Sequence, residues 1–377
     1  MDNRGTIGIV GGGQLGRMLS LAAMPLGFKV IVVDPGKNSP AAQVGAEQIM
    51  GDLYDQAALE RLADRADFLT VEIEHLDTKI LEDIAKAGKP VNPAPQTIRL
   101  IQDKFKQKEF LHASGVPVAP FCELTDSDSA KKALTKFGNK MLVKTRHGAY
   151  DGRGNMVVKN EADIKKAFEL FDGKQLYAEA FVPFKKELAV MVARSIAGNV
   201  ALYPIVQTIH ERNICVEVLA PAPISDQERG KAEKVARNVA KLLDGAGTFA
   251  IEMFLTTDGK VLVNEIAPRV HNSGHYTIEA SRTSQFEQHM RAIAGLPLGD
   301  TSMVVPAAVM INILGERNGE TQLRGLDKVL GIPHTSVHIY GKSPTKVDRK
   351  MGHITATGKT IAEARRRARQ ARKQLDI

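Results

Sequence analysis

The amino-acid sequence predicts a protein of mixed α/β and α+β architecture with two or three domains. Its length of 377 residues exceeds that of one typical domain, and 43% hydrophobic residues are enough for several buried cores. The first ninety or so residues alternate strand and helix patterns, which is typical of a parallel sheet covered by helices. Later segments pair strands through short turns, which is typical of α+β units.

The N-terminal region is predicted to be Rossmann-like. Apolar periodicity predicts strands at TIGIVGG, KVIVVD and FLTVEI. It also predicts three helices: one that begins at Gln14, one from Gln56 to Arg65, and one that ends at Ala87. Pro25 should kink or end the first helix near Met24, because proline cannot continue a helical hydrogen-bond pattern. Only about three strands fit before the proline-marked junction at 90–93, about half of a full dinucleotide-binding fold.

A glycine motif, Gly11-x-Gly13-x-x-Gly16, lies between the first strand and the first helix, and Asp34 closes the second strand. This arrangement matches the fingerprint of dinucleotide-binding proteins and by itself suggests NAD. A tight turn at a helix N-terminus, which can receive any phosphate or polar ligand, explains the same glycines. A nicotinamide-dinucleotide-binding oxidoreductase therefore stays open as an alternative from a different class.

The middle of the chain is predicted to begin with one helix from Gln96 to about Ala113, which Gly115-Val116-Pro117 ends. A small α+β unit follows, with strands at PVAPF, MLVKT, MVVK and QLYAEAF and a helix from Glu161 to Phe171. The larger remainder has long strands at KELAVMVARS, ALYPIVQT, AAVMINIL and SVHIYG and a helix from Gln227 to Leu243.

Composition predicts a cytoplasmic protein that binds neither membranes nor nucleic acid. No apolar run approaches the roughly 18 residues that span a bilayer, and the first residues lack the pattern of a signal peptide. Cys122 and Cys215 lie far apart, which indicates reduced thiols with packing roles. The net charge of +8 is mostly interspersed and suits small anionic substrates. In the basic C-terminal stretch, apolar residues recur at helical spacing, which predicts an amphipathic helix with a solvated face.

The most informative stretch is AIEMFLTTDGKVLVNEIAPRVHNSGH, residues 250–275. Asp258-Gly259 between two apolar runs predicts a two-residue hairpin turn. Counting outward from this turn gives the pairs Thr257–Lys260, Phe254–Val263 and Glu252–Glu265. Like charges directly opposite each other destabilise a sheet unless a cation lies between them, so the acids predict magnesium and nucleotide phosphates. A bulge that shifted the register would instead place the acids on opposite faces.

A glycine-rich tip, VKTRHGAYDGRGNMVV, predicts a flap whose backbone amides wrap phosphate oxygens. Lys144, on the strand that enters the tip, can reach those phosphates as a point charge. We interpret Glu179 to Val182 as an edge segment that binds adenine through its backbone, and Glu187 as a ligand of the ribose hydroxyls.

A lid lysine, a hinge strand and a diacid that ends in Asn264-Glu265 resemble, in this order, the ATP-grasp superfamily. Within it, GIVGGGQLGRM, KTRHGAYDGRGN and NEIAPRVHNSGHYTIEASRTSQFEQH are similar to the N5-carboxyaminoimidazole ribonucleotide synthetases, and the similarity runs from residue 5 to about 356. The chain departs from that family's usual residues at Ala149, Asn155, Val270 and His75, and no departure removes a charge that the chemistry needs.

The resemblance implies a ligase of purine biosynthesis that carboxylates 5-aminoimidazole ribonucleotide with ATP and bicarbonate through carboxyphosphate, forming ADP and phosphate. It implies an ATP-grasp fold divided into a Rossmann-like domain (1–95), a linker helix and lid (96–185), a core with the metal hairpin (186–300) and a C-terminal portion that closes the acceptor site (301–377). It also implies a homodimer that passes its product to a separate mutase.

The resemblance further implies a role for each of four groups of residues. Those for ATP are Lys104, Lys144, Tyr150, Asp151, Gly152, Arg153, Gly154, Asn155, Glu179, Ala180, Phe181, Val182, Glu187, His210, Asn264 and Glu265. Those for the imidazole nucleotide are Gln14, Leu15, Glu72, Tyr150, Asp151, Lys342 and Arg349, the last two on its 5′-phosphate. Those for bicarbonate, carboxyphosphate and catalysis are Arg269, His271 and Asn272, with Asp151 or the departing phosphate as acceptor of the amine proton. Those for magnesium are Glu252 and Glu265.

Two other interpretations stay open beside these, the nicotinamide-dinucleotide-binding oxidoreductase described above and a different ATP-grasp ligase. An ATP-grasp relative that uses formate or an amine would share the ATP residues but differ at Tyr150-Asp151 and at Arg269-x-His271.

Three single residues or pairs have simpler explanations. His271 and His275 have the spacing of a helical metal pair, but Asn-Ser-Gly between them breaks helices, so zinc is not predicted. We interpret Glu74 as a solvated neighbour of Glu72, and His338 as a satisfied strand residue.

Overall fold

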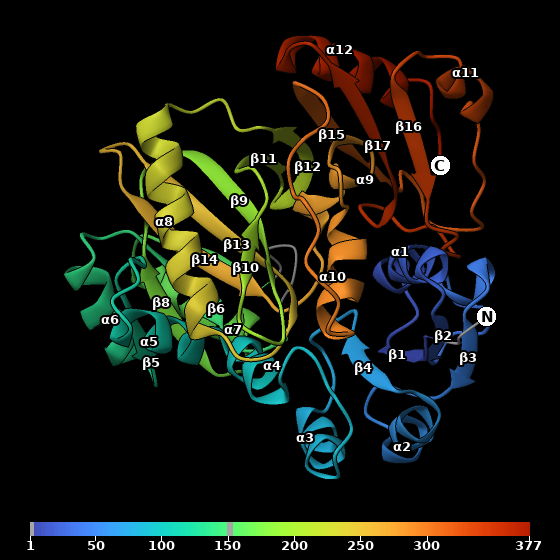
Figure 1. Cartoon of the computed structure of the whole chain (residues 1–377). Coiled ribbons are helices and arrows are strands. Elements are labelled where there is room, and N and C mark those ends of the chain that lie inside the picture. Colours follow the sequence, from blue (N-terminus) through green and yellow to red (C-terminus); the bar gives the residue numbers. More distant parts are fainter. Residues whose placement is uncertain (1–3, 149–153) are drawn as a thin grey trace.

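The computed structural model describes residues 4–148 and 154–377 and arranges their strands in three sheets (Figure 1). No described helix is long and apolar enough to cross a membrane.

The N-terminal sheet is parallel, with the order β3-β2-β1-β4. Its strands are β1 (Thr6–Val10), β2 (Lys29–Asp34), β3 (Glu47–Met50) and β4 (Phe68–Val71). Its helices are α1 (Gln14–Ala23), α2 (Gln56–Arg65) and α3 (Thr78–Lys86), with 3-10 turns η1 (Met24–Leu26) and η2 (Ala42–Val44). The predicted end of the first helix before Pro25 is confirmed. The prediction of three strands missed β3, in which only Ile49 is buried and the apolar signal is weak.

The linker contains two helices, α4 (Pro95–Gln102) and α5 (Lys104–Ala113), so the prediction of one continuous helix is wrong. The break lies at Asp103, whose side chain accepts hydrogen bonds from the backbone amides of Phe105 and Lys106. A carboxylate at this position satisfies amides that a helix start leaves open. The break places Lys104 at the first position of α5, beside the acidic hairpin.

The lid is a four-stranded antiparallel sheet with the order β5-β8-β6-β7. Its strands are β5 (Phe121–Leu124), β6 (Met141–Thr145), β7 (Asn155–Val158) and β8 (Leu176–Ala180). Two helices, α6 (Ser127–Lys136) and α7 (Glu161–Leu170), share one apolar core with these strands.

The largest sheet has nine strands and runs from the acidic hairpin to the C-terminal region in the order β14-β13-β9-β11-β12-β15-β17-β16, with β10 beside β9. Its strands are β9 (Phe184–Arg194), β10 (Val200–Leu202), β11 (Val206–Glu211), β12 (Ile214–Ala220), β13 (Gly247–Thr256), β14 (Val261–Ala267), β15 (Ala307–Leu314), β16 (Thr335–Ile339) and β17 (Lys350–Gly358). The accompanying helices are α8 (Asp226–Leu242), η3 (Asn272–Gly274), α9 (Thr277–Ala280), α10 (Gln285–Ile293), α11 (Leu326–Leu330) and α12 (Ile361–Arg372).

The two faces of this sheet have different neighbours because side chains alternate along each strand. On what we call the outer face, Leu188 packs with α8 and Leu219 packs with α12. The inner face carries Glu187, His210 and Glu252, which alternate with outer-face residues in the paired strands. The predicted amphipathic C-terminal helix is confirmed, because the Ala364, Ala368 and Ala371 side chains of α12 are buried.

The N-terminal domain packs against the large sheet through α1, which contacts α10 (Figure 1). Their side chains share a single apolar core that also includes Val270 and Tyr340. This contact places the glycine motif at the start of α1 near the chain that leaves β14.

Candidate active site

The two acids of the hairpin face each other as predicted, because Glu252 in β13 pairs with Glu265 in β14. The turn differs from the prediction. The backbone amide of Thr256 donates to the carbonyl of Lys260 at 2.9 Å, which closes a three-residue loop containing Gly259 at φ 77°. The predicted pairs Thr257–Lys260 and Phe254–Val263 are therefore wrong, since Phe254 pairs with Leu262.

A bulge at Asn264 restores the pairing of the acids. The backbone of Val263, next to it, is already engaged outside the hairpin: its amide donates to Pro117 at 2.8 Å, and its carbonyl accepts from Lys108 at 3.2 Å. The longer turn and the bulge each shift the register by one residue, and the two shifts cancel. The predicted pairing of Glu252 with Glu265 is therefore correct, although the pairs predicted closer to the turn are wrong.

The two facing acids differ in charge. Burial and the adjacent Glu265 raise the pKa of Glu252 to about 7. Burial also disfavours the charge on Glu265, but Lys104, whose Nζ lies 2.7 Å from Oε2, lowers the pKa of Glu265 to about 2. Near neutral pH Glu265 is therefore ionised, whereas Glu252 exchanges its proton readily.

This donor set fits a magnesium ion carried by a nucleotide. The described residues contain no cluster of three or more metal-binding side chains, so two carboxylates would leave most of the coordination shell to phosphates and water. A cation between the acids would remove the repulsion that raises the pKa of Glu252. The hard oxygen donors match magnesium better than softer metals.

The lid presents a buried ion cluster around Glu179. Lys144 Nζ lies 3.0 Å from Oε2, and Lys108 Nζ lies 3.3 Å from Oε1. Burial opposes ionisation of Glu179, but the two lysines lower its pKa to about 2. Lys144 is thereby fixed on β6, opposite Asn155 of β7.

The expectation of an edge segment is wrong for Glu179 and Ala180, because β8 has neighbours on both sides, β5 and β6. The amide of Ala180 donates to the carbonyl of Pro120 at 2.8 Å. Only Phe181 and Val182, which follow the end of β8, lie outside the strands. Adenine binding by backbone groups is thus expected at these two residues.

The glycine-rich tip is only partly described. Gly154 accepts a hydrogen bond from the Thr145 amide at 2.9 Å at the base of the tip. Tyr150, Asp151, Gly152 and Arg153 lie outside the described residues, so their predicted roles in binding ATP and the imidazole nucleotide stay predictions.

Glu187 and His210 form a pair on the inner face of the large sheet. His210 Nδ1 lies 2.7 Å from Glu187 Oε2. Burial disfavours the imidazolium, but the interaction with Glu187 raises the pKa of His210 overall. The predicted role of these two residues in ATP binding, with Glu187 on the ribose hydroxyls, stays a prediction.

Arg269 connects the large sheet with the N-terminal domain. Its Nε lies 2.5 Å from Glu74 Oε2, and its Nη2 lies 3.0 Å from Oε1, a bidentate pair between residues 195 positions apart. Burial opposes ionisation of Glu74, but Arg269 lowers its pKa to about 2. The interpretation of Glu74 as a merely solvated residue is therefore wrong.

His271 and Asn272 follow Arg269 at the edge of the acidic hairpin. His271 Nε2 lies 3.6 Å from Glu252 Oε1, and its Nδ1 lies 3.0 Å from Ser273 Oγ. Burial, and then the positive charge of Arg269, lower the pKa of His271 to about 3, so the ring is neutral. The amide groups of Asn272 and Asn312 bond each other at 2.9 and 2.6 Å.

Glu72 occupies the helix N-terminus that the glycine motif creates. Its Oε1 accepts from the Gly13 amide and its Oε2 from the Gly16 amide, both at 2.5 Å. A Cβ atom at Gly11 would lie 2.4 Å from the Cγ of Glu72, so the glycine makes room for this carboxylate. Burial raises the pKa of Glu72 in spite of these two bonds.

The glycine fingerprint therefore does not point to NAD. The amides that would receive a pyrophosphate already bind Glu72, and Asp34 accepts from the Gly12 amide at 3.0 Å. Beside this loop, Gln14 begins α1, whereas the Leu15 side chain is buried in the shared core.

Lys342 and Arg349, the two residues predicted to bind the 5′-phosphate, lie in the loop between β16 and β17, and we call them the clamp. Lys342 Nζ donates to the Lys350 carbonyl at 2.9 Å, and Arg349 Nη1 donates to the Pro344 carbonyl at 2.5 Å. Burial raises the pKa of Glu72, and the positive charge of Lys342 opposes this rise, so the clamp is within electrostatic reach of the glycine loop. The backbone of this loop also touches the N-terminal domain, because Gln43 donates to the Gly341 carbonyl at 2.9 Å.

A stack of histidines connects the clamp with the chain that follows His271. His353 on β17 stacks on His338 at a centroid distance of 4.5 Å and contacts His275 at 4.8 Å. His338 Nε2 lies 2.5 Å from Glu279 Oε1, so its interpretation as a satisfied strand residue is confirmed. Tyr340 completes the stack through its hydroxyl, 2.9 Å from His353 Nδ1.

Sequence reasoning missed two charged residues that organise the site, Glu74 and Lys108. A signal was available for each. Glu72 and Glu74 follow a buried strand at the carboxyl end of a parallel sheet, where ligands commonly bind. Lys104 and Lys108 are four residues apart on α5 and so share one face of the helix.

Comparison with known proteins adds three matching family profiles. They are the ribonucleotide synthetase preATP-grasp domain over residues 4–102, the ATP-grasp domain over 109–286, and the phosphoribosylaminoimidazole carboxylase C-terminal domain over 308–367.

Individual relatives cover almost the whole chain. A phosphoribosylaminoimidazole carboxylase of Ogataea methanolica is 48% identical over 97% of this chain, which spans 69% of that protein. An N5-carboxyaminoimidazole ribonucleotide synthase of Bacillus subtilis is 40% identical over 93% of this chain and 90% of its own length.

Solved structures agree with these sequence relatives. The N5-carboxyaminoimidazole ribonucleotide synthetase of Thermotoga maritima superposes with a TM-score of 0.90 at 44% identity, over 99% of both chains. The Aspergillus clavatus synthase, in complex with ADP and 5-aminoimidazole ribonucleotide, gives 0.92 at 40% identity over 98% of both chains.

Proposed function

Because this chain belongs to the N5-carboxyaminoimidazole ribonucleotide synthase family of ATP-grasp ligases, we propose that it carboxylates 5-aminoimidazole ribonucleotide with ATP and bicarbonate. The products are N5-carboxyaminoimidazole ribonucleotide, ADP and phosphate, in the purine pathway.

The reaction needs two steps. A bicarbonate oxygen attacks the γ-phosphorus of ATP, the bond to the β-phosphate oxygen breaks, and carboxyphosphate and ADP form. Carboxyphosphate then releases carbon dioxide and phosphate, and the amine nitrogen attacks the carbon and loses a proton. Water must stay outside, because it hydrolyses the mixed anhydride.

The described residues supply the charges for the first step. Magnesium, held by Glu252 and Glu265 together with the phosphates, would neutralise charge on the transferred phosphoryl group. Lys104 on α5 and Lys144 on β6 would add positive charge, and each is fixed by a carboxylate. Phe181, Val182, Glu187 and His210 would hold adenine and ribose.

Arg269 and His271 would bind bicarbonate next to the γ-phosphate. Arg269 is already oriented by the bidentate Glu74, and its Nη1 donates one hydrogen to the Val270 carbonyl at 3.2 Å. The second hydrogen of Nη1 can then donate to a carboxylate without further ordering of the side chain. His271 is neutral and beside Glu252, so it can donate or accept a hydrogen bond without adding charge. Asn272 completes this side of the site.

The acceptor would lie between the glycine loop and the clamp. Gln14 and Glu72 come from the N-terminal domain, and Lys342 and Arg349 from the loop between β16 and β17. The charges of Glu72 and Glu265 both raise the pKa of Arg269, which therefore lies within reach of both halves of the site. The amine would thus be held where carbon dioxide is released.

The single observation that carries the proposal is the facing pair Glu252 and Glu265, with Lys104 on one acid and His271 beside the other. Such a pair has little reason to exist without a cation and a nucleotide.

The test is ADP release with bicarbonate and 5-aminoimidazole ribonucleotide omitted in turn. We expect release to depend on magnesium and to fall at least tenfold without the imidazole nucleotide, since chemistry should await both ligands. Equal ADP release without the acceptor would contradict the proposal. An unchanged rate without added metal, after chelation, would contradict the role of the diacid.

A further inference from the structure

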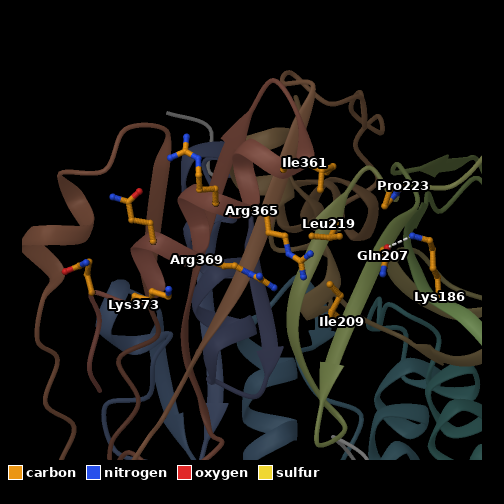
Figure 2. Close-up of a pocket in the computed structure, with 13 residues that line it drawn as sticks. Lys186, Gln207, Ile209, Leu219, Pro223, Ile361, Arg365, Arg369 and Lys373 are labelled. Carbon is orange, nitrogen blue, oxygen red and sulfur yellow. Dashed lines mark hydrogen bonds between the residues drawn. The ribbon is translucent and has the colours of Figure 1, made fainter.

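A basic groove lies on the outer face of the large sheet, opposite the face that carries Glu187 and His210. Figure 2 shows the side chains that line it. It has a volume of about 990 Å³ and lies between α12 and the strands β9, β11 and β12. Small-molecule sites commonly have volumes of about 300–1,000 Å³, so the groove has room for a ligand of nucleotide size.

The groove is strongly positive. Among the residues that the structure describes, its lining includes the cations Lys186, Arg365, Arg366, Arg369 and Lys373 and no acidic residue. Two of the arginines are held in place by Glu217, which accepts hydrogen bonds from Arg365 at 2.7 Å and from Arg369 at 2.6 Å. Arg366 and Lys373 are exposed on the rim. A ligand with several negative charges would satisfy this arrangement.

The floor of the groove is apolar. Ile209, Leu219 and Pro223 lie between the arginines of α12 on one side and Lys186 on the other (Figure 2). Gln207, which accepts from Lys186 at 2.9 Å, adds an amide at the edge of this floor. A planar base on the apolar floor, an amide to bond its edge and cations for its phosphates together match a nucleotide better than a free phosphate.

The groove and the proposed ribose site lie on opposite faces of the same two strands, β9 and β11. Lys186 and Ile209 line the groove, and the next residue of each strand, Glu187 and His210, forms the inner-face pair at 2.7 Å. A register shift between Ile209 and His210 lies at this point of β11. A ligand that moves Lys186 or Ile209 therefore acts directly on the backbone that holds Glu187 and His210.

We propose that this groove is a second binding site, for a nucleoside polyphosphate that modulates ATP binding at the inner face. Binding in the groove and binding at the ATP site would be coupled, and the coupling would be equal in both directions. The coupling, though not the groove itself, rests on the function proposed above.

The test is equilibrium dialysis of the full chain with ADP as the probe. We expect two ADP per wild-type chain, and one in the double variant Arg366→Glu, Lys373→Glu, whose second site should be at least tenfold weaker. The matched control, Lys234→Glu with Arg237→Glu, makes the same charge change on the exposed surface of α8 and should keep both sites. Lys144→Met should lose the other ADP, which tests the proposed active site separately.

Steady-state kinetics provide the second part of the test. The groove variant should keep the wild-type kcat with ATP, but its KM for ATP should no longer change when GTP is added. Only one ADP on the wild-type chain, or two on the groove variant, would overturn the proposal. So would equal competition by inorganic tripolyphosphate, since it would remove the role of the base. A change of molecular mass in the groove variant, with ADP binding intact, would show that a second copy of the chain covers the groove.

Discussion

Two buried carboxylate sites of this protein, Glu72 at the glycine loop and Glu252 at the acidic hairpin, are satisfied in opposite ways. Glu72 receives two backbone amides from its own domain, at 2.5 Å each. Glu252 faces a second acid, and its pKa is raised to about 7 by burial and by that acid. The first site is complete within the chain, whereas the second needs a cation from outside.

This difference shows what a motif can and cannot reveal. The glycine spacing correctly indicated a turn with exposed amides at a helix start, but the anion that fills it is the chain's own Glu72. The facing acids were informative because their geometry is unfavourable without a ligand. An unsatisfied charge is therefore stronger evidence for binding than a favourable backbone shape.

The largest expected effect is loss of catalysis in Glu265→Gln. Glu265 is the ionised member of the pair and the partner of Lys104 at 2.7 Å. Removal of one preorganised charge from a phosphoryl-transfer site typically costs about 10²–10³ in kcat. ADP release at saturating magnesium measures this. Turnover within tenfold of wild type would mean that the hairpin does not hold the metal.

The next effect concerns the acceptor side, where Arg349→Ala should weaken use of 5-aminoimidazole ribonucleotide. Losing a charged hydrogen bond costs about 1.5–3 kcal/mol, or roughly ten- to a hundredfold in KM. The KM for ATP should barely change. Lys346→Ala, on the same loop, is the matched control and should behave as wild type. An equal loss for both substrates in Arg349→Ala would place this residue outside the clamp.

The substitution Glu252→Gln should abolish activity but increase the stability of the ligand-free protein. The folded-state pKa of Glu252 is raised from 4.5 to about 7, so ionisation destabilises the fold progressively as pH rises through this window. The gain should be about 3 kcal/mol at pH 8, at about 1.36 kcal/mol per pKa unit, and small near pH 4.5. Urea unfolding without magnesium at both pH values measures it. A gain that does not depend on pH would reject the charge repulsion.

Glu72→Gln should have the opposite sign. A glutamine offers one carbonyl oxygen to two amides, so either Gly13 or Gly16 loses its acceptor. An unsatisfied buried donor costs about 1–3 kcal/mol. Burial also raises the pKa of Glu72, so loss of the buried charge offsets part of this cost at pH 8. Urea unfolding at pH 8 should therefore register a small loss of stability. If this variant were stabilised like Glu252→Gln, the contrast between the two carboxylate sites would disappear.

Much of the fold could be predicted from local patterns, and the failures have physical causes. The strand at 29–34 and the helix at 56–65 have the predicted bounds, because their apolar periods are regular and their ends are marked. The helix predicted from Gln96 breaks at Asp103 because this side chain caps α5. The bulge at Asn264 lies next to Val263, whose backbone bonds Pro117 and Lys108 from other elements, which no local pattern reveals.

In the candidate site, too, local features could be predicted from the sequence, whereas contacts between distant elements could not. The facing acids could be found because a hairpin is local, although their register depended on two deviations that cancel. The pair of Arg269 with Glu74 joins residues 195 positions apart, and the cluster around Glu179 joins α5, β6 and β8. Such pairs depend on how the domains pack, so sequence spacing alone does not predict them.

The most direct test of the central claim is the fate of oxygen from ¹⁸O-labelled bicarbonate. If a bicarbonate oxygen attacks the γ-phosphorus and carboxyphosphate later breaks at its carbon–oxygen bond, one labelled oxygen must end in inorganic phosphate. Mass spectrometry of the phosphate, with 5-aminoimidazole ribonucleotide present, should therefore show one ¹⁸O for each ADP formed. ADP formation with unlabelled phosphate would mean that another nucleophile attacks ATP, and it would contradict the account.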